Sequence, residues 1–168
     1  MTGPDEFQPP PTFGADSGAE GGPGPEVRRP LRLWIALARS YLTFSRAVSA
    51  NISEFGLTTA QFGVLEALHH LGPLSLGELA EKLLVTGGNI TYVMDRLEEQ
   101  GYVARERSSQ DRRVILAHLT PQGAELMTSV FPEHAAFIQR SLAHLEPGEQ
   151  EELRRLLKKL GKKMPGRG

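Results

Sequence analysis

Hydrogen-bonding side chains occupy one face of a segment that has helical periodicity. Within residues 87–99, Asn89, Tyr92 and Arg96 are spaced at i, i+3 and i+7, on a different face from the apolar residues. Asn and Arg suit bidentate hydrogen bonding to the edges of adenine and guanine in the major groove. A face that is merely solvated would more often consist of Glu and Lys. The pattern therefore predicts that this face, with Thr91 on the same helix, contacts DNA bases or phosphates.

The start of the same segment is suited to holding an anion. Thr86 is of the type that caps helix N-termini, and Gly87 and Gly88 follow it. Main-chain N–H groups at a helix N-terminus attract phosphate, and glycine lets a ligand approach the backbone closely. A phosphate contact is therefore expected here. The alternative is that Thr86 only caps the helix, and the two roles are compatible.

A second group of charged residues lies between two short runs of β-forming residues, 102–107 and 113–119. The tip between the runs carries Asp111, followed by Arg112 and Arg113. A tight hairpin favours Asn-Gly or Asp-Gly at its turn, and neither occurs there. The charged residues at the tip therefore need a reason other than turn geometry.

Both groups belong to a series of elements that begins with a long helix. From Leu31 onward, apolar residues recur at spacings of 3, 4, 3 and 4, as in a helix that packs against another helix. These residues are Trp34, Leu37, Tyr41, Phe44 and Val48. The seam either covers the protein's own core or joins two copies in a dimer.

Capping residues mark the next two helices. Thr58 with Gln61, and Ser75 with Glu78, have the spacing of a capping box. A short turn then leads to the helix at residues 87–99. Two short helices joined in this way make a helix-turn-helix.

Two more amphipathic helices follow the hairpin. Thr120 with Pro121 starts the first, which continues to Leu145, and Pro147 starts the second, which ends at Gly161. The order is therefore helix, helix-turn-helix, hairpin, long helix, short helix. It indicates a mainly α fold with a small β-hairpin wing, that is, a winged helix-turn-helix with flanking dimerisation helices.

Over residues 31–163 the chain resembles the MarR family of bacterial transcription regulators. The motifs that carry the resemblance are LTTAQFGVL, LGELAEKL, VMDRLEEQGYV, DRRV and LTPQG, in this order and spacing. The segments LLVTGGNITYVMDRLEEQGYV and FPEHA are similar to the MhqR-like subgroup, which responds to quinones and related phenolics. The resemblance implies dimerisation helices at 31–55 and 120–163, and a DNA-binding lobe at 57–119.

The resemblance also implies roles for the hairpin tip. In the family the second arginine of the matching motif enters the minor groove and the aspartate orients it, which corresponds to Arg113 and Asp111 here. A narrow A·T-rich minor groove favours an inserted arginine. Arg107 and Arg112 are then expected to contact phosphates. The alternative for these residues is a surface ion pair worth under about 1 kcal/mol.

A homodimer on a double-stranded, pseudo-palindromic operator is the partner arrangement that the resemblance implies. Ligands of the family sit between the dimer interface and the DNA-binding lobe, and Tyr41 and His134 are candidates for such an effector pocket. The expected function is a repressor released by a small aromatic, phenolic or quinone-like effector. Ordinary core packing is the alternative for these two residues. A winged-helix protein-interaction module without DNA binding, or a metal-responsive regulator, is the alternative function.

Composition argues against several other classes of protein. The chain has no cysteine, which removes disulfides, Cys-ligated metal centres and thiol-based sensing. Its histidines lack metal-ligand spacing, and no nucleophile elbow, P-loop or dinucleotide fingerprint occurs, so no metal, cofactor or enzymatic activity is expected. No apolar run is long enough for a membrane span and no secretory signal is present, so a cytoplasmic location is expected.

Charge is distributed unevenly along the chain. Residues 1–30 contain five acidic residues and two arginines, a balance of −3, so the net charge of −1 leaves +2 for residues 31–168. The same 30 residues hold seven of the twelve prolines and six glycines, and are expected to form a disordered tail. An excess of +2 is too small to indicate DNA binding by itself. That prediction therefore depends on where the charges lie.

Overall fold

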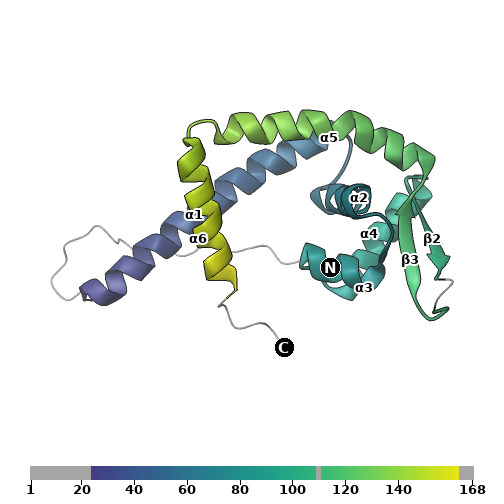
Figure 1. Cartoon of the computed structure of the whole chain (residues 1–168), viewed down its shortest axis with the longest axis horizontal. Helices are drawn as coiled ribbons and strands as arrows, with labels where there is room; N and C mark the ends of the chain where they lie inside the picture. Colours follow the sequence, from purple (N-terminus) through teal and green to yellow (C-terminus); the bar gives the residue numbers. More distant parts are fainter. Residues whose placement is uncertain (1–23, 109–110, 163–168) are drawn as a thin grey trace, which may run out of the picture. The chain divides into compact units, whose positions relative to one another are not determined.

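Helices make up most of the computed structural model, which describes residues 24–108 and 111–162. The helices are α1 (Pro25–Glu54), α2 (Thr59–Leu71), α3 (Leu76–Leu83), α4 (Gly87–Glu99), α5 (Pro121–Leu142) and α6 (Pro147–Gly161), and the strands are β1 (Leu74–Ser75), β2 (Val103–Arg107) and β3 (Ile115–Leu119) (Figure 1). The chain divides into two compact units, residues 1–50 and 51–168, so that α1 belongs to the first unit except for its last turn.

The predicted boundary between the N-terminal tail and the first helix was wrong. Helix α1 begins at Pro25, whereas the sequence predicted a tail up to residue 30. Proline is favourable at the first helical position and Glu26 suits the positive end of the helix dipole, so the helix starts early and continues through Pro30. The tail predicted for residues 1–23 lies outside the described residues. Along the predicted seam, Trp34 and Tyr41 are 48% and 61% exposed.

Capping residues set the helix boundaries of the second unit, as predicted. Thr58 and Ser75 each accept a hydrogen bond from the main-chain N–H three residues on, and the side chain of that residue bonds back to the N–H of the cap. Thr86 caps α4 and Thr120 caps α5 by the first of these bonds alone: each side chain accepts the main-chain N–H three residues on, from Asn89 and Gly123 respectively. The helix-turn-helix expected at α3 and α4 is therefore present.

The core of the second unit lies where α2, α3, α4, α5 and the strands meet. Its side chains follow the helical and strand periods: the fully buried ones include Leu65, Leu79, Met94, Val103 and Met127, each from a different element. Because the apolar face of α4 packs into this core, its polar face points to solvent. The sequence prediction of one apolar face on this helix is confirmed by burial of Ile90, Val93, Met94 and Leu97.

The wing is part of a three-stranded antiparallel sheet in the order β1-β3-β2. Strands β2 and β3 pair from Val103 opposite Leu119 to Arg107 opposite Ile115, as the predicted hairpin requires. Strand β1 was not predicted, because a two-residue strand has no periodicity to detect. It pairs with β3 at the start of α3 and so attaches the wing to the helix-turn-helix.

The junction between the wing and α5 explains the glycine of the LTPQG motif. A Cβ atom on Gly123 would lie 2.0 Å from the main-chain oxygen of Tyr102. Thr120 reinforces the same contact, since its hydroxyl donates to the Gly101 carbonyl at 2.6 Å and its N–H to the Tyr102 carbonyl at 3.1 Å. The first turn of α5 therefore lies directly against the residues that lead into β2.

Candidate nucleic-acid interface

The outward face of α4 carries the predicted DNA-binding side chains. Asn89, Tyr92 and Arg96 are all exposed, Tyr92 by 61%. The Arg96 guanidinium lies 5.5 Å from the centroid of the Tyr92 ring and its Nη1 donates to Glu99 Oε2 at 2.9 Å. The structure thus brings the three residues onto one exposed surface. It also shows that Nη1 of Arg96 is engaged by Glu99, while a guanidinium has further N–H donors that can reach a base or phosphate.

The N-terminus of α4 is open. Thr86 Oγ1 accepts a hydrogen bond from the N–H of Asn89 at 3.4 Å, so its capping role is observed and its phosphate contact stays a prediction. A Cβ atom added at Gly87 or Gly88 would meet nothing within 4 Å, and neither residue has a positive φ. The fold itself does not require glycine at these positions. Close approach of a ligand to the backbone would account for them.

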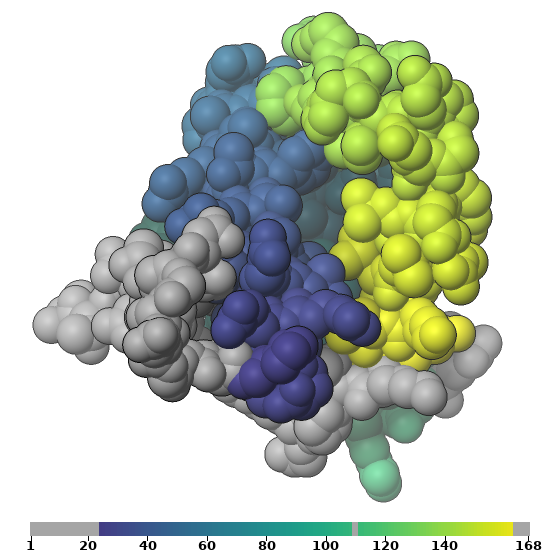
Figure 2. Space-filling model, turned by 90° about the vertical axis from the view of Figure 1, so that its left-hand side faces the viewer, coloured from purple at the N-terminus to yellow at the C-terminus, as the bar shows by residue number. Residues whose placement is uncertain are grey.

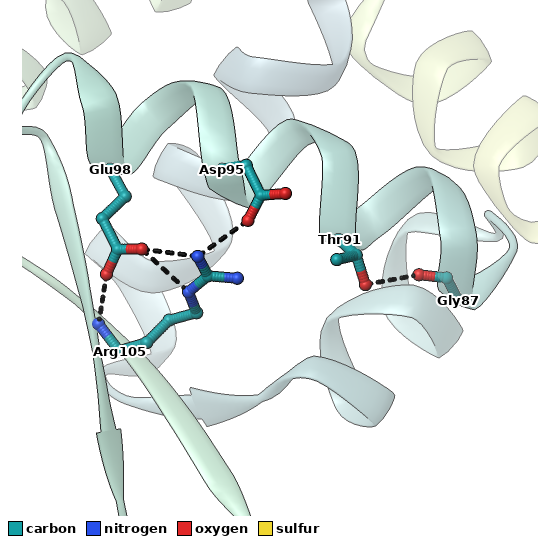
Figure 3. Close-up of polar contacts among 5 residues, drawn as sticks. All are labelled: Gly87, Thr91, Asp95, Glu98 and Arg105. Carbon is teal, nitrogen blue, oxygen red and sulfur yellow. Dashed lines mark hydrogen bonds and ion pairs between the residues drawn. The ribbon is translucent and has the colours of Figure 1, made fainter.

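Thr91 is turned back toward its own helix. Its hydroxyl donates to the Gly87 carbonyl at 3.0 Å, as Figure 3 shows. The donor is therefore occupied, while the oxygen keeps lone pairs that can accept a hydrogen bond. Thr91 is exposed, so a DNA contact through that oxygen or through its methyl group remains a prediction.

The wing tip is held by main-chain contacts. Asp111 Oδ1 accepts a hydrogen bond from the main-chain N–H of Arg113 at 3.0 Å, and Arg107 Nη1 donates to the Arg112 carbonyl at 3.5 Å. Within the described residues no ion pair joins the side chains of Asp111 and Arg113. Asp111 can therefore orient Arg113 through the backbone, not by holding its guanidinium. All four residues are exposed, and residues 109–110 of the tip lie outside the described ranges.

One cluster at this surface was not predicted from the sequence. Arg105 on β2 donates from Nε to Glu98 Oε2 at 3.0 Å and from its main-chain N–H to Glu98 Oε1 at 3.2 Å, and its Nη2 pairs with both Glu98 and Asp95 (Figure 3). The Nη2 to Asp95 Oδ1 distance is 2.7 Å. Glu98, followed by Asp95, raises the pKa of Arg105. Helix period alone could not reveal the cluster, because it joins a helix to a strand.

The two candidate effector residues lie in different units. His134, on α5, is 7% exposed; its ring packs against Phe62 with the centroids 4.6 Å apart. His134 Nδ1 lies 2.8 Å from Asn51 Oδ1. Tyr41 lies on α1 and is 61% exposed. A shared pocket for the two residues therefore stays a prediction.

Other kinds of site find no support in the described part of the chain. Residues 24–108 and 111–162 contain no group of three or more His, Asp or Glu side chains placed to hold a metal ion. No helix in these ranges is both long and apolar enough to cross a membrane.

Comparison with known proteins identifies regulators that are similar to this chain. A family model described as MarR family matches residues 55–114. The chain is 39% identical over 136 residues to YkoM, an uncharacterised HTH-type transcriptional regulator of Bacillus subtilis, covering 81% of this chain and 88% of YkoM. It is 37% identical over 135 residues to the HTH-type regulator MhqR of the same organism, covering 80% and 93% of the two chains.

A solved structure shares the fold as well. BpsR of Bordetella bronchiseptica matches with a TM-score of 0.68 and 29% identity, over 75% of this chain and 90% of BpsR. The DNA binding of BpsR is regulated by 6-hydroxynicotinic acid. The similarity extends beyond the helix-turn-helix to most of both chains.

Proposed function

The chain belongs to the MarR family of DNA-binding transcription regulators, and we propose that it acts as a homodimeric repressor that a small phenolic effector releases from its operator. The observation that carries the DNA-binding mode is that one lobe presents both an exposed α4 face with Asn89 and Arg96 and a wing tip with Arg112 and Arg113. In this mode α4 enters the major groove. The wing reaches the adjacent minor groove, where Arg113 inserts.

Exposed apolar side chains support a homodimer. On α6, Leu153, Leu156, Leu157 and Leu160 form one stripe, and each remains 44–46% exposed. The other side of α6 carries the ion pairs Glu151–Arg154 and Glu152–Arg155, which suit a solvated face. Figure 2 looks onto the surface that includes α6, drawn in yellow. Leucines left exposed in a regular stripe indicate that a second surface covers them, and we propose a second copy of the chain.

The hydrogen-bond partner of the His134 ring supports an effector that donates a hydrogen bond. Asn51 directs its Nδ2 to Glu54 Oε2 at 3.5 Å, so its Oδ1 is the atom that faces His134 Nδ1. Because an amide oxygen only accepts, His134 Nδ1 must carry the proton and Nε2 is left as an acceptor in the neutral ring. Within the described residues no hydrogen bond reaches Nε2. A phenol could donate its O–H to this nitrogen and place its ring among Phe62 and Phe137.

Selection of bound sites from random duplex DNA tests the proposal. We expect a pseudo-palindromic sequence bound by a dimer, with an affinity that falls steeply with salt because bound phosphates release counterions. Phenol, catechol and hydroquinone are then titrated into the complex. A weak, nearly salt-independent interaction with every duplex would favour a protein-interaction module instead. If the operator is bound tightly and no phenol changes that affinity, the effector assignment is wrong but the DNA-binding function stands.

A further inference from the structure

Glu98 binds two different parts of Arg105. One carboxylate oxygen accepts the main-chain N–H of the strand and the other accepts Nε and Nη2 of the guanidinium, while Asp95 pairs with the same Nη2 (Figure 3). A contact to a flexible side chain alone would leave the strand free to shift. Because the backbone is held as well, the position of β2 relative to α4 is fixed at this point.

The contact between Arg105 and Glu98 is less exposed than the ion pairs on α6. The Arg105 side chain is 26% exposed and that of Glu98 is 38% exposed, so solvent screens the charges only in part. Nε and Nη2 both donate to Glu98 Oε2, and two charge-assisted bonds from one planar guanidinium are more directional than a point contact. The cluster therefore holds an orientation and does more than bring opposite charges together.

This constraint continues to the wing tip. Arg107 is two residues beyond Arg105 on β2 and lies on the same side of the strand, and its Nη1 reaches the Arg112 carbonyl. At the tip, the Val114 N–H donates to the Asp111 carbonyl at 2.9 Å. A connected series of bonds thus links α4 to the residues that flank Arg113.

We propose that Asp95, Glu98 and Arg105 form a clamp that positions the wing relative to α4, so that both grooves are engaged by one rigid lobe. The three residues are positioning residues and make no DNA contact themselves. The inference rests on the proposed binding mode, in which α4 lies in the major groove and Arg113 in the minor groove. On this proposal, the clamp determines how well the wing recognises the DNA segment beneath it. Recognition of the bases that α4 contacts does not depend on the clamp.

Two variants separate orientation from charge. Arg105→Lys keeps the positive charge but loses the planar fork. The triple variant Asp95→Asn, Glu98→Leu, Arg105→Met removes the clamp, including the acceptor for the main-chain N–H of residue 105. It also makes the cluster less negative, which by Coulomb's law alone would tighten DNA binding. Arg155→Lys, which alters an ion pair of similar length on α6, serves as the matched control.

The DNA experiment uses two duplexes with the same selected major-groove bases and either A·T or G·C pairs beneath the wing. We expect wild type and Arg155→Lys to prefer the A·T duplex by about tenfold, as for one inserted arginine. In Arg105→Lys and in the triple variant this preference should fall to about twofold or less, while discrimination at the major-groove bases remains. Clamp variants that keep the full A·T preference, or that lose both kinds of discrimination together, would overturn the proposal.

Hydrogen exchange on the free protein keeps the clamp testable if the DNA-binding mode itself fails. We expect main-chain amides of residues 103–107 and 115–119 to exchange at least about tenfold faster in both clamp variants than in wild type, with α2 and α5 unchanged. Equal exchange in the wing would show that the clamp does not hold it. Faster wing exchange in a protein whose wild type binds no duplex would contradict the proposed function and not the clamp.

Discussion

Asp111 accepts a hydrogen bond from the main-chain N–H of Arg113, with Oδ1 3.0 Å from that nitrogen. The carboxylate thereby bends the tip backbone back on itself, as aspartate does in Asx turns. The family resemblance had suggested an aspartate that orients the arginine. In this chain Asp111 contacts the backbone of Arg113, and it is through this contact that the aspartate could orient the arginine.

Comparison of Asp111→Asn with Asp111→Ala tests this contact. Both changes remove the same negative charge, but the Asn side chain keeps an oxygen that can accept the Arg113 N–H. We expect Asp111→Ala to bind the operator about 2–10-fold more weakly than Asp111→Asn, the range for one hydrogen bond. Fluorescence anisotropy with one labelled duplex measures both. Equal affinities would show that the turn does not position Arg113.

The contact between Gly123 and Tyr102 predicts a large loss of stability on adding a methyl group. Gly123→Ala would place Cβ 2.0 Å from a main-chain oxygen, which no side-chain rotation can relieve. We expect the free energy of unfolding to fall by about 1–3 kcal/mol or more. Gly148→Ala in the first turn of α6 is the control, because its Cβ would meet nothing within 4 Å. Urea denaturation compares the two, and similar losses in both would refute the steric explanation.

Substitution of Leu84 by glycine should change the free energy of unfolding in the opposite direction. Leu84 ends α3 with φ of 55° and is 92% exposed, so it occupies a left-handed conformation without burying its side chain. Glycine adopts this conformation without strain, and the gain exceeds its extra entropy in the unfolded chain. Leu84→Gly should therefore raise the free energy of unfolding by about 0.5–1 kcal/mol. A lower denaturation midpoint with an unchanged slope would contradict this account.

His134→Phe tests the effector site without emptying it. Phenylalanine retains the aromatic packing against Phe62 but cannot accept a hydrogen bond. We expect operator affinity to stay within about twofold, whereas the phenol concentration needed for release should rise by about 2–10-fold. Wild type should also respond more strongly to hydroquinone than to benzoquinone, which has no O–H to donate. An unchanged phenol response in His134→Phe would exclude Nε2 as the acceptor.

Local chemistry made most of the fold predictable. Capping boxes at Thr58 and Ser75 and the apolar face of α4 depend on neighbouring residues, so the sequence displays them directly. Strand β1 and the Arg105 cluster depend on residues that only folding brings together. The early start of α1 was missed because proline-rich composition outweighed the favourable placement of Pro25 and Glu26.

The placement of the candidate site residues was predictable to a similar extent, while their contacts with DNA remain a prediction. The residues proposed to contact DNA could be named because Asn89 and Arg96 share a helix face and Arg113 lies at a hairpin tip. Their existing partners are local as well. Arg96 pairs with Glu99 three residues on, a spacing that favours ion pairs on a helix, and Asp111 accepts the N–H of Arg113 two residues on, as in an Asx turn. Spacing permits these contacts, but the side-chain rotamers decide whether they form.

Salt dependence of operator binding is the measurement that tests the central claim most directly. Wild type, Arg113→Ala and Asn89→Ala are titrated against the selected duplex over a range of salt concentrations. We predict a steep linear fall of log affinity with log salt for wild type, and a slope reduced by about one charge per subunit in Arg113→Ala. Asn89→Ala should keep the wild-type slope and lose discrimination among bases, because it removes a neutral group. A shallow slope for wild type, unchanged by either substitution, would show that α4 and the wing do not form the DNA interface.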